Sequence, residues 1–233
     1  MAGVRSVLRR FRRNRLTGTG LASESIDSYR DFWDSSAVAD AENAVAHGVE
    51  DVWGSGASEL TMLQPYLSPD ASVLEVGCGI GRIMYHVAPH CREMHGVDIS
   101  AEMLKLAAKN LAHVPNVKLH LGSGYDLPLP ADEFDFVYSC RVFQHVPKNV
   151  VLNYLKEVHR VLKPGKKFAL QIPNILLDEH MDALNHFAQP EFFRNPYPMY
   201  FYTPAEVERL GSYAGFEVKV VDDWLLAILT KPG

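Results

Sequence analysis

The residues between Glu75 and Asp98 could bind a nucleotide-type cofactor. Three glycines, Gly77, Gly79 and Gly81, stand two apart behind a short apolar run. Glycines at this spacing let the backbone turn sharply and let a ligand approach the main chain before the next helix. Asp98 follows 21 positions after Gly77, about where a dinucleotide fold places its ribose-binding acid. Glu75 lies inside a buried strand and needs a partner, either the backbone amides of the loop or a cationic ligand group.

Two further side chains could serve catalysis. The unperturbed pKa of a histidine side chain is about 6.5, so a neutral imidazole at His145 could accept a proton from a hydroxyl or an ammonium group. The alternative is structural, with the histidine bonding the backbone to hold its loop. Arg141 could bind a carboxylate or phosphate through both arms of its guanidinium, or pair with an acid of the protein.

Alternating strands and helices position these residues. Short apolar runs bounded by turn residues predict strands at 73–76, 94–97, 117–121, 134–140, 166–173, 216–221 and 225–230. Helices are expected at 57–67, at 101–112 behind an N-cap at Ser100, and from Thr203, while 53–56 reads as a turn. In an open sheet of this kind the ligand lies beyond the carboxyl ends of the strands, so the loops after the first and fourth strands should enclose the site.

Several ordered motifs together resemble one family. The glycine segment follows Glu75, the run Phe-Asp-Phe-Val-Tyr-Ser-Cys-Arg-Val-Phe-Gln-His-Val-Pro spans 134–147, and Val-His-Arg-Val-Leu-Lys-Pro-Gly spans 158–165. These segments, within 73–172, resemble the class I S-adenosylmethionine-dependent methyltransferases of the small-molecule type. The resemblance implies an α/β fold with a Rossmann-like seven-stranded sheet of order 3-2-1-4-5-7-6, its last strand antiparallel, and helices on both faces.

The resemblance also implies roles for individual residues. The cofactor would be S-adenosylmethionine, the product S-adenosylhomocysteine, and the acceptor a small molecule methylated on oxygen, nitrogen or carbon. Asp98 would hold the ribose hydroxyls. Ser123 stands where the family often has the acid that binds the adenine amino group, which puts this contact in doubt, and Asp126 is a second source of a carboxylate. The residues expected around the cofactor are Glu75, Gly77, Cys78, Gly79, Asp98, Ile99, Met103, Ser123, Gly124, Tyr125 and Cys140.

Two segments outside these motifs could cover the site. Residues 21–67 read as a helical cap in which Ile26, Tyr29, Phe32 and Trp33 share one face, and Tyr29 and Trp33 could close over the cofactor or simply pack. Residues 174–203 form an insertion rich in aromatic side chains. This insertion could be a lid over an apolar acceptor pocket, a packed aromatic core, or the interface of a homodimer.

Composition indicates a single domain over 21–233 behind a basic arm at 1–20. Six of the 23 basic residues lie in the first fifteen positions, which leaves 17 basic against 28 acidic residues, a net charge of −11, in the rest of the chain. The arm is either a solvated tail, which we favour, or an amphipathic helix that contacts an anionic membrane surface. Three cysteines without a CxxC pair, and no long apolar run, favour a cytoplasmic protein without structural zinc. No metal is expected.

Three other functions share some of these features. A nicotinamide oxidoreductase has the same fold class but would not be expected to carry the later methyltransferase-like segments. An RNA methyltransferase would use the arginine-rich arm, although the acidic body makes nucleic acid an unfavourable partner. A non-catalytic cofactor-binding or assembly protein would bind S-adenosylmethionine without turnover.

Overall fold

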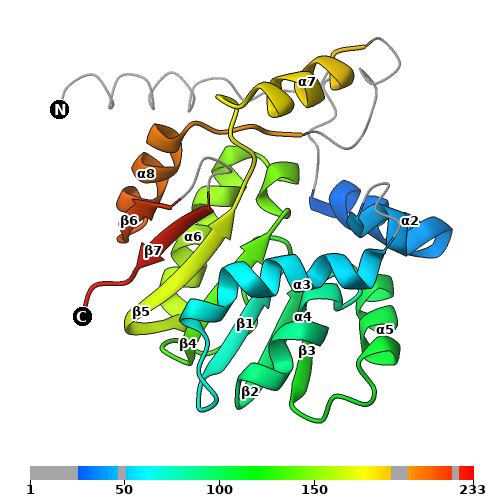
Figure 1. The fold of residues 1–233 in the computed structure, drawn as a ribbon, viewed down its shortest axis with the longest axis vertical. Helices are drawn as coiled ribbons and strands as arrows, with labels where there is room; N and C mark the ends of the chain where they lie inside the picture. Colours follow the sequence, from blue (N-terminus) through cyan, green and yellow to red (C-terminus); the bar gives the residue numbers. More distant parts are fainter. Residues whose placement is uncertain (1–25, 47–50, 190–198, 222–225) are drawn as a thin grey trace, which may run out of the picture.

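The computed structural model describes residues 26–46, 51–189, 199–221 and 226–233 (Figure 1). Its centre is a seven-stranded sheet of order β3-β2-β1-β4-β5-β7-β6. Only β7 runs antiparallel to its neighbours β5 and β6. The predicted strand order and the antiparallel last strand are confirmed. The strands are β1 (Ser72–Val76), β2 (Glu93–Asp98), β3 (Val117–Leu121), β4 (Phe134–Cys140), β5 (Leu162–Gln171), β6 (Glu217–Val220) and β7 (Leu226–Thr230).

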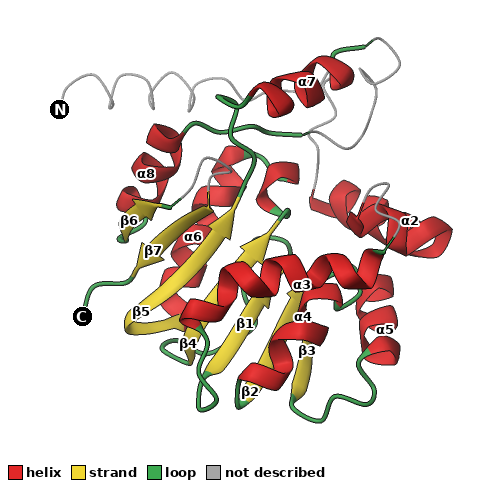
Figure 2. Ribbon diagram, viewed as in Figure 1, coloured by secondary structure: helices red, strands yellow, loops and turns green. Residues whose placement is uncertain are grey.

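Helices cover both faces of this sheet (Figure 2). Along β1, Val73 belongs to an apolar cluster with α3 and α4, whereas Leu74 belongs to a cluster with α6 and α8, because successive strand residues point to opposite faces. The helices are α2 (Ile26–Ala46), α3 (Val52–Leu63), α4 (Arg82–Val87), α5 (Ala101–Asn110), α6 (Lys148–Val161), α7 (Asp178–Phe187) and α8 (Pro204–Tyr213), and the short 3-10 helices are η1 (Gln64–Tyr66), η2 (Ala88–His90) and η3 (Phe143–His145).

The predicted turn at 53–56 is wrong, because these residues form the first turns of α3. The Asp51 carboxylate accepts the Gly54 N–H at 2.8 Å and caps the helix. Gly56 lies against α4, where an added Cβ would come within 2.7 Å of the Arg82 carbonyl oxygen. Gly56 therefore serves the close packing of α3 on α4 and not a turn.

The parallel strands β1, β4 and β5 bring their carboxyl ends to one edge of the sheet. Helices α2 and α7 lie beyond this edge, apart from the layers that cover the sheet faces (Figure 1). Helix α2 contains a kink at Asp40. In the part of the chain that the structure describes, no helix is long and apolar enough to cross a membrane.

Candidate active site

A cavity of about 590 Å³ lies at the carboxyl edge of the sheet, between the ends of β1, β2, β4 and β5 and the helices α2 and α7. Most of the residues predicted from the sequence meet there. The predicted residues that line the cavity are Tyr29, Trp33, Glu75, Gly77, Cys78, Gly79, Asp98, Ile99, Met103, Gly124, Cys140, Arg141 and His145.

The glycine loop after β1 requires its glycines. Gly77, Gly79 and Gly81 have φ values of 80°, 50° and 85°, in the left-handed region that favours glycine. A Cβ on Gly77 would also lie 2.3 Å from Val142, which follows β4 across the cavity. The Gly77 N–H donates to the Val97 carbonyl at 2.7 Å, so the loop is tied to the end of β2.

Asp98 closes the other side of this loop. Its carboxylate accepts the backbone N–H of Gly79 at 2.8 Å and that of Ser100 at 2.9 Å. Burial raises the pKa of Asp98, and the hydrogen bonds from these amides act in the opposite direction. The acid therefore holds the glycine loop and the start of α5 in one geometry.

Glu75 is 2% exposed, and its partner is a residue that the sequence analysis did not name. The Tyr138 hydroxyl donates to Glu75 Oε2 at 2.8 Å. Burial raises the pKa of Glu75 to about 8, because a buried carboxyl favours its neutral form. The predicted bonds from the loop amides are not formed, since the amides of Gly77 and Gly79 donate to Val97 and Asp98.

A buried ion-pair network, also missed from the sequence, supports the cavity wall. Glu59 of α3 accepts two hydrogen bonds from the Arg82 guanidinium, at 3.2 and 3.3 Å, and the Ser55 hydroxyl accepts a third at 2.9 Å. Arg141 lies 3.4 Å from the same Glu59 carboxylate. Arg141 also has φ = 61°, which is unusual for a residue with a side chain and turns the chain sharply at the end of β4.

His145 is buried in η3 and lines the cavity. The amide nitrogen of Gln144 lies 3.0 Å from His145 Nε2, and because an amide nitrogen can only donate, Nε2 is the acceptor. The His145 ring meets the Trp33 ring edge to face, with 5.9 Å between centroids. Two neighbours thus orient the imidazole.

Helix α2 is joined to the cofactor loops by polar contacts as well as by Trp33. The Asp34 carboxylate accepts the Ser100 hydroxyl at 2.6 Å, and the Arg30 guanidinium donates to the Ser123 carbonyl at 3.3 Å. Tyr29, one turn before Trp33, is buried against the cavity. Tyr29 and Trp33 of the predicted helical cap thus line the cavity, and their closing over a cofactor stays a prediction.

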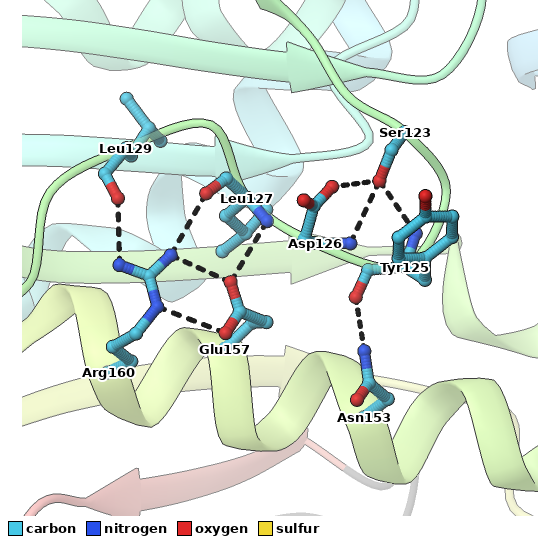
Figure 3. Close-up of polar contacts among 8 residues, drawn as sticks. All are labelled: Ser123, Tyr125, Asp126, Leu127, Leu129, Asn153, Glu157 and Arg160. Atoms are coloured by element: carbon cyan, nitrogen blue, oxygen red, sulfur yellow. Dashed lines mark hydrogen bonds and ion pairs between the residues drawn. The ribbon is translucent and has the colours of Figure 1, made fainter.

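Ser123 and Tyr125 are the predicted site residues that do not line this cavity. The Ser123 hydroxyl donates to the Asp126 carboxylate and accepts the backbone N–H groups of Tyr125 and Asp126 (Figure 3). One donor and two acceptor sites are thus all used within the loop. The Tyr125 side chain is exposed.

Helix α6 fixes the loop that follows Ser123. Asn153 donates to the Tyr125 carbonyl, and Glu157 accepts the Leu127 N–H at 3.1 Å (Figure 3). Arg160 donates to the carbonyls of Leu127 and Leu129 at 2.9 and 2.8 Å. These contacts hold the loop from outside and keep its backbone at the rim of the cavity.

The predicted insertion at 174–203 contains the helix α7. Within it, Phe201 and Tyr202 are buried, and Tyr202 packs into the cluster beneath α6 and α8. The predicted aromatic residues Phe192, Phe193 and Tyr197 lie outside the described residues. From α7, Ala183 and the buried His180 face the cavity. The lid and dimer hypotheses stay predictions.

Within residues 26–46, 51–189, 199–221 and 226–233, no three metal-ligand side chains come together. The cysteines Cys78, Cys91 and Cys140 are unpaired and buried, and burial raises the pKa of each thiol. Thiols of this kind are poor nucleophiles.

Residues 73–165 match the family model described as a methyltransferase domain. A demethylmenaquinone methyltransferase of Lysinibacillus sphaericus is 35% identical over 108 residues, which are 45% of each chain. The uncharacterized methyltransferase YcgJ of Bacillus subtilis is 33% identical over 128 residues, 52% of this chain and 50% of YcgJ. The chain thus spans about half the length of these relatives.

Solved structures of methyltransferases are similar in fold to this chain. The crystal structure of YcgJ has a TM-score of 0.59 at 25% identity, over 71% of this chain and 70% of YcgJ. A S-adenosylmethionine-dependent methyltransferase of Methanosarcina mazei has a TM-score of 0.60 at 22% identity, over 73% of this chain and 97% of its own. The glycine loop, the acid after β2, the strand order and these matches agree: residues 73–165 match a methyltransferase domain, and the chain is similar in fold to the class I S-adenosylmethionine-dependent methyltransferases.

Proposed function

We propose that this protein transfers a methyl group from S-adenosylmethionine to a small-molecule acceptor. The observation that carries the proposal is the cavity of about 590 Å³, which has the glycine loop with Asp98 on one side and, on the other, the apolar residues that follow β4 and β5, namely Val142, Phe143, Ile172 and Pro173. Cavities that take small molecules have volumes of about 300 to 1,000 Å³. A covered cavity of this size favours a small acceptor over a macromolecule.

The residues present fit the cofactor. Asp98 accepts hydrogen bonds from the backbone amides of Gly79, Ser100 and Ile99, and since a carboxylate has about four acceptor sites it could also accept a ribose hydroxyl. Ile99 and Met103 offer apolar surface beside it for a base. Gly77 and Gly79 have no side chain, so the methionine part of the cofactor can approach their backbone. The Ser123 hydroxyl already uses its donor and both acceptor sites within its own loop, so it would not bond to the adenine.

The protein's own contribution is positioning. When bound, S-adenosylmethionine supplies a methyl group that its sulfonium makes electrophilic. Holding an acceptor in line with such a group yields effective molarities of about 10⁵ M or more. Helix α2 contributes Tyr29 and Trp33 to the cavity wall, where they would reduce the access of water. His145 Nε2, the acceptor nitrogen of the neutral imidazole, would accept the proton of the acceptor once that molecule displaces the Gln144 amide from it.

The curated relatives support the small-molecule part of the proposal, because they include demethylmenaquinone methyltransferases. The methylated atom is left open, since this fold serves oxygen, nitrogen and carbon acceptors. The cytoplasmic location stays a prediction. So do the RNA and membrane hypotheses for the arginine-rich arm, which lies outside the described residues.

Titration calorimetry with S-adenosylhomocysteine, with NAD as the control ligand, tests the cofactor. We expect binding of the first and not of the second, and failure to bind S-adenosylhomocysteine would overturn the proposal. An acceptor screen with labelled methyl donor follows. In that screen His145→Ala should bind the cofactor product normally and transfer slowly, whereas His113→Ala, at an exposed position away from the cavity, should match the wild type. Full activity of His145→Ala would show that the histidine is structural.

A further inference from the structure

Arg141 brings a positive charge to the wall of the cavity. It follows the last residue of β4 and lines the cavity, and 42% of its side-chain surface is exposed. Its φ of 61° is unfavourable for a residue that has a side chain, and glycine would adopt it at lower cost. Backbone strain of this kind is concentrated at functional sites. An accessible arginine held in this conformation beside a cavity is therefore a candidate for ligand binding.

The carboxylate of Glu59 does not neutralise the charge of Arg141. Arg82 donates two hydrogen bonds to this carboxylate, at 3.2 and 3.3 Å. Arg141 lies 3.4 Å from one of the same oxygens, but within the part of the chain that the structure describes its guanidinium donates no hydrogen bond. Two guanidinium groups thus share one carboxylate, and the donors of the second are available to a ligand.

The other acids of the cavity do not supply the missing negative charge. Glu75 lies close enough to Glu59 and Arg82 to feel their charges, but burial raises its pKa to about 8, so at pH 7 it is mainly neutral. Asp98 lies at the end of β2, where it accepts backbone amides. One positive charge is left beside Arg141, which matches a carboxylate better than a doubly charged phosphate.

Two molecules could bring a carboxylate to this place. Arg141 precedes Val142, whose side chain would lie 2.3 Å from a Cβ on Gly77, so the arginine stands next to the glycine loop that would hold the amino-acid part of the cofactor. His145, four residues further on, lines the same cavity, on the side where an acceptor would have to lie for that histidine to take its proton. The guanidinium would recognise either carboxylate by the same chemistry.

We propose that Arg141 binds a carboxylate group inside the cavity, either that of the cofactor's amino-acid part or one carried by the acceptor. The inference rests on the proposed function for the identity of the cofactor and for the meaning of acceptor. A guanidinium is planar and can donate two parallel hydrogen bonds to one carboxylate, which fixes the orientation of the ligand as well as its charge. Arg141 is then a binding residue and takes no part in proton transfer.

The test uses two pairs of ligands in titration calorimetry. The members of each pair differ in a carboxylate: S-adenosylhomocysteine and its decarboxylated analogue, and, with saturating S-adenosylhomocysteine present, benzoate and benzamide. In at least one pair we expect the wild type to prefer the carboxylate, and Arg141→Gln to lose about tenfold or more of that preference, as hydrogen bonds to a charged group imply. Arg141→Lys keeps the charge without the planar fork and should lose less.

Arg92→Gln is the matched control. Arg92 lies 3.5 Å from Glu93, has 55% of its side-chain surface exposed, and is not among the residues that line the cavity. The control loses a similar ion pair and should keep both preferences of the wild type. The decarboxylated analogue should bind Arg141→Gln as tightly as it binds the wild type, which shows that the variant is folded and that only the carboxylate contact is lost.

Each result decides the proposal. A loss of preference in the first pair assigns the carboxylate to the cofactor, and a loss in the second assigns it to the acceptor. Preferences that are unchanged in Arg141→Gln for both pairs overturn the proposal, as does an equal loss of affinity for both members of each pair. Failure of the wild type itself to bind S-adenosylhomocysteine is a different result, and it overturns the proposed function together with this inference.

Discussion

Replacement of Glu75 by glutamine should make the protein more stable at neutral pH and leave it nearly unchanged at low pH. In the folded protein the pKa of Glu75 is about 8, against an ordinary value of 4.5, because the carboxyl is buried beside the Tyr138 hydroxyl. Between these values the folded protein holds a proton that the unfolded chain has lost. Stability therefore falls as pH rises from 4.5 to 8, and above 8 the penalty is constant.

Glutamine has nearly the same shape, can still accept from Tyr138 and does not ionise, so Glu75→Gln lacks this pH dependence. Integrated between pH 5 and pH 7, these two pKa values lower the wild type's free energy of unfolding by about 2.5 kcal/mol. The variant should gain that much relative to the wild type over this interval. The total penalty removed by pH 8 is about 4 kcal/mol.

Urea denaturation at pH 5, 6, 7 and 8, followed by tryptophan fluorescence, measures this difference. Glu208→Gln, at an exposed position on α8, is the matched control and should follow the wild type at every pH. A difference between Glu75→Gln and the wild type that is the same at pH 5 and pH 7 would refute the reasoning. It would mean that Glu75 is ionised in the folded protein, with a charge partner that compensates its burial.

Three other predictions follow from the cavity wall. Asp98→Ala should weaken S-adenosylhomocysteine binding by about 2 to 3 kcal/mol in calorimetry, as expected for hydrogen bonds to a charged group, and unchanged affinity would remove the ribose assignment. Glu59→Leu leaves the buried Arg82 guanidinium unpaired and should destabilise the protein by about 3 to 5 kcal/mol in urea, whereas a loss below about 1 kcal/mol would show that Arg82 finds other partners. Gly77→Ala should abolish cofactor binding because its Cβ would clash with Val142. Adding Val142→Ala to this variant should restore only part of the binding, because the φ of 80° at position 77 still disfavours alanine.

The parts of the site that follow from local sequence were predictable. Gly77 and Gly79 predict a loop with positive φ angles after one strand, and Asp98 ends another. Neighbouring parallel strands end at the same edge of the sheet, which brings these residues together. The strand order came from the resemblance, since no periodicity reveals which strands are neighbours.

The parts that depend on contacts between distant segments were not predictable. Glu59 and Arg82 are 23 positions apart, and an acid within a helix reads as a solvated side chain until the packing of α3 on α4 buries it. The saturation of Ser123 depends on the turn that Asp126 makes with it. No sequence pattern indicates that the Gln171 Oε1 atom is buried without a hydrogen-bond partner among the described residues.

The attachment of α2 sets how the cavity can open. A small apolar cluster of Ala37, Ile80 and Met103, with a few neighbours, joins this helix to the glycine loop and α5, and it is separate from the two clusters that hold the sheet. Cooperative units in a protein follow such divisions, and the free energy needed to open one unit is less than that of global unfolding. We therefore expect helix α2 to open at a lower free energy than the sheet, and its backbone amides to exchange hydrogen with solvent faster than those of β1 and β4.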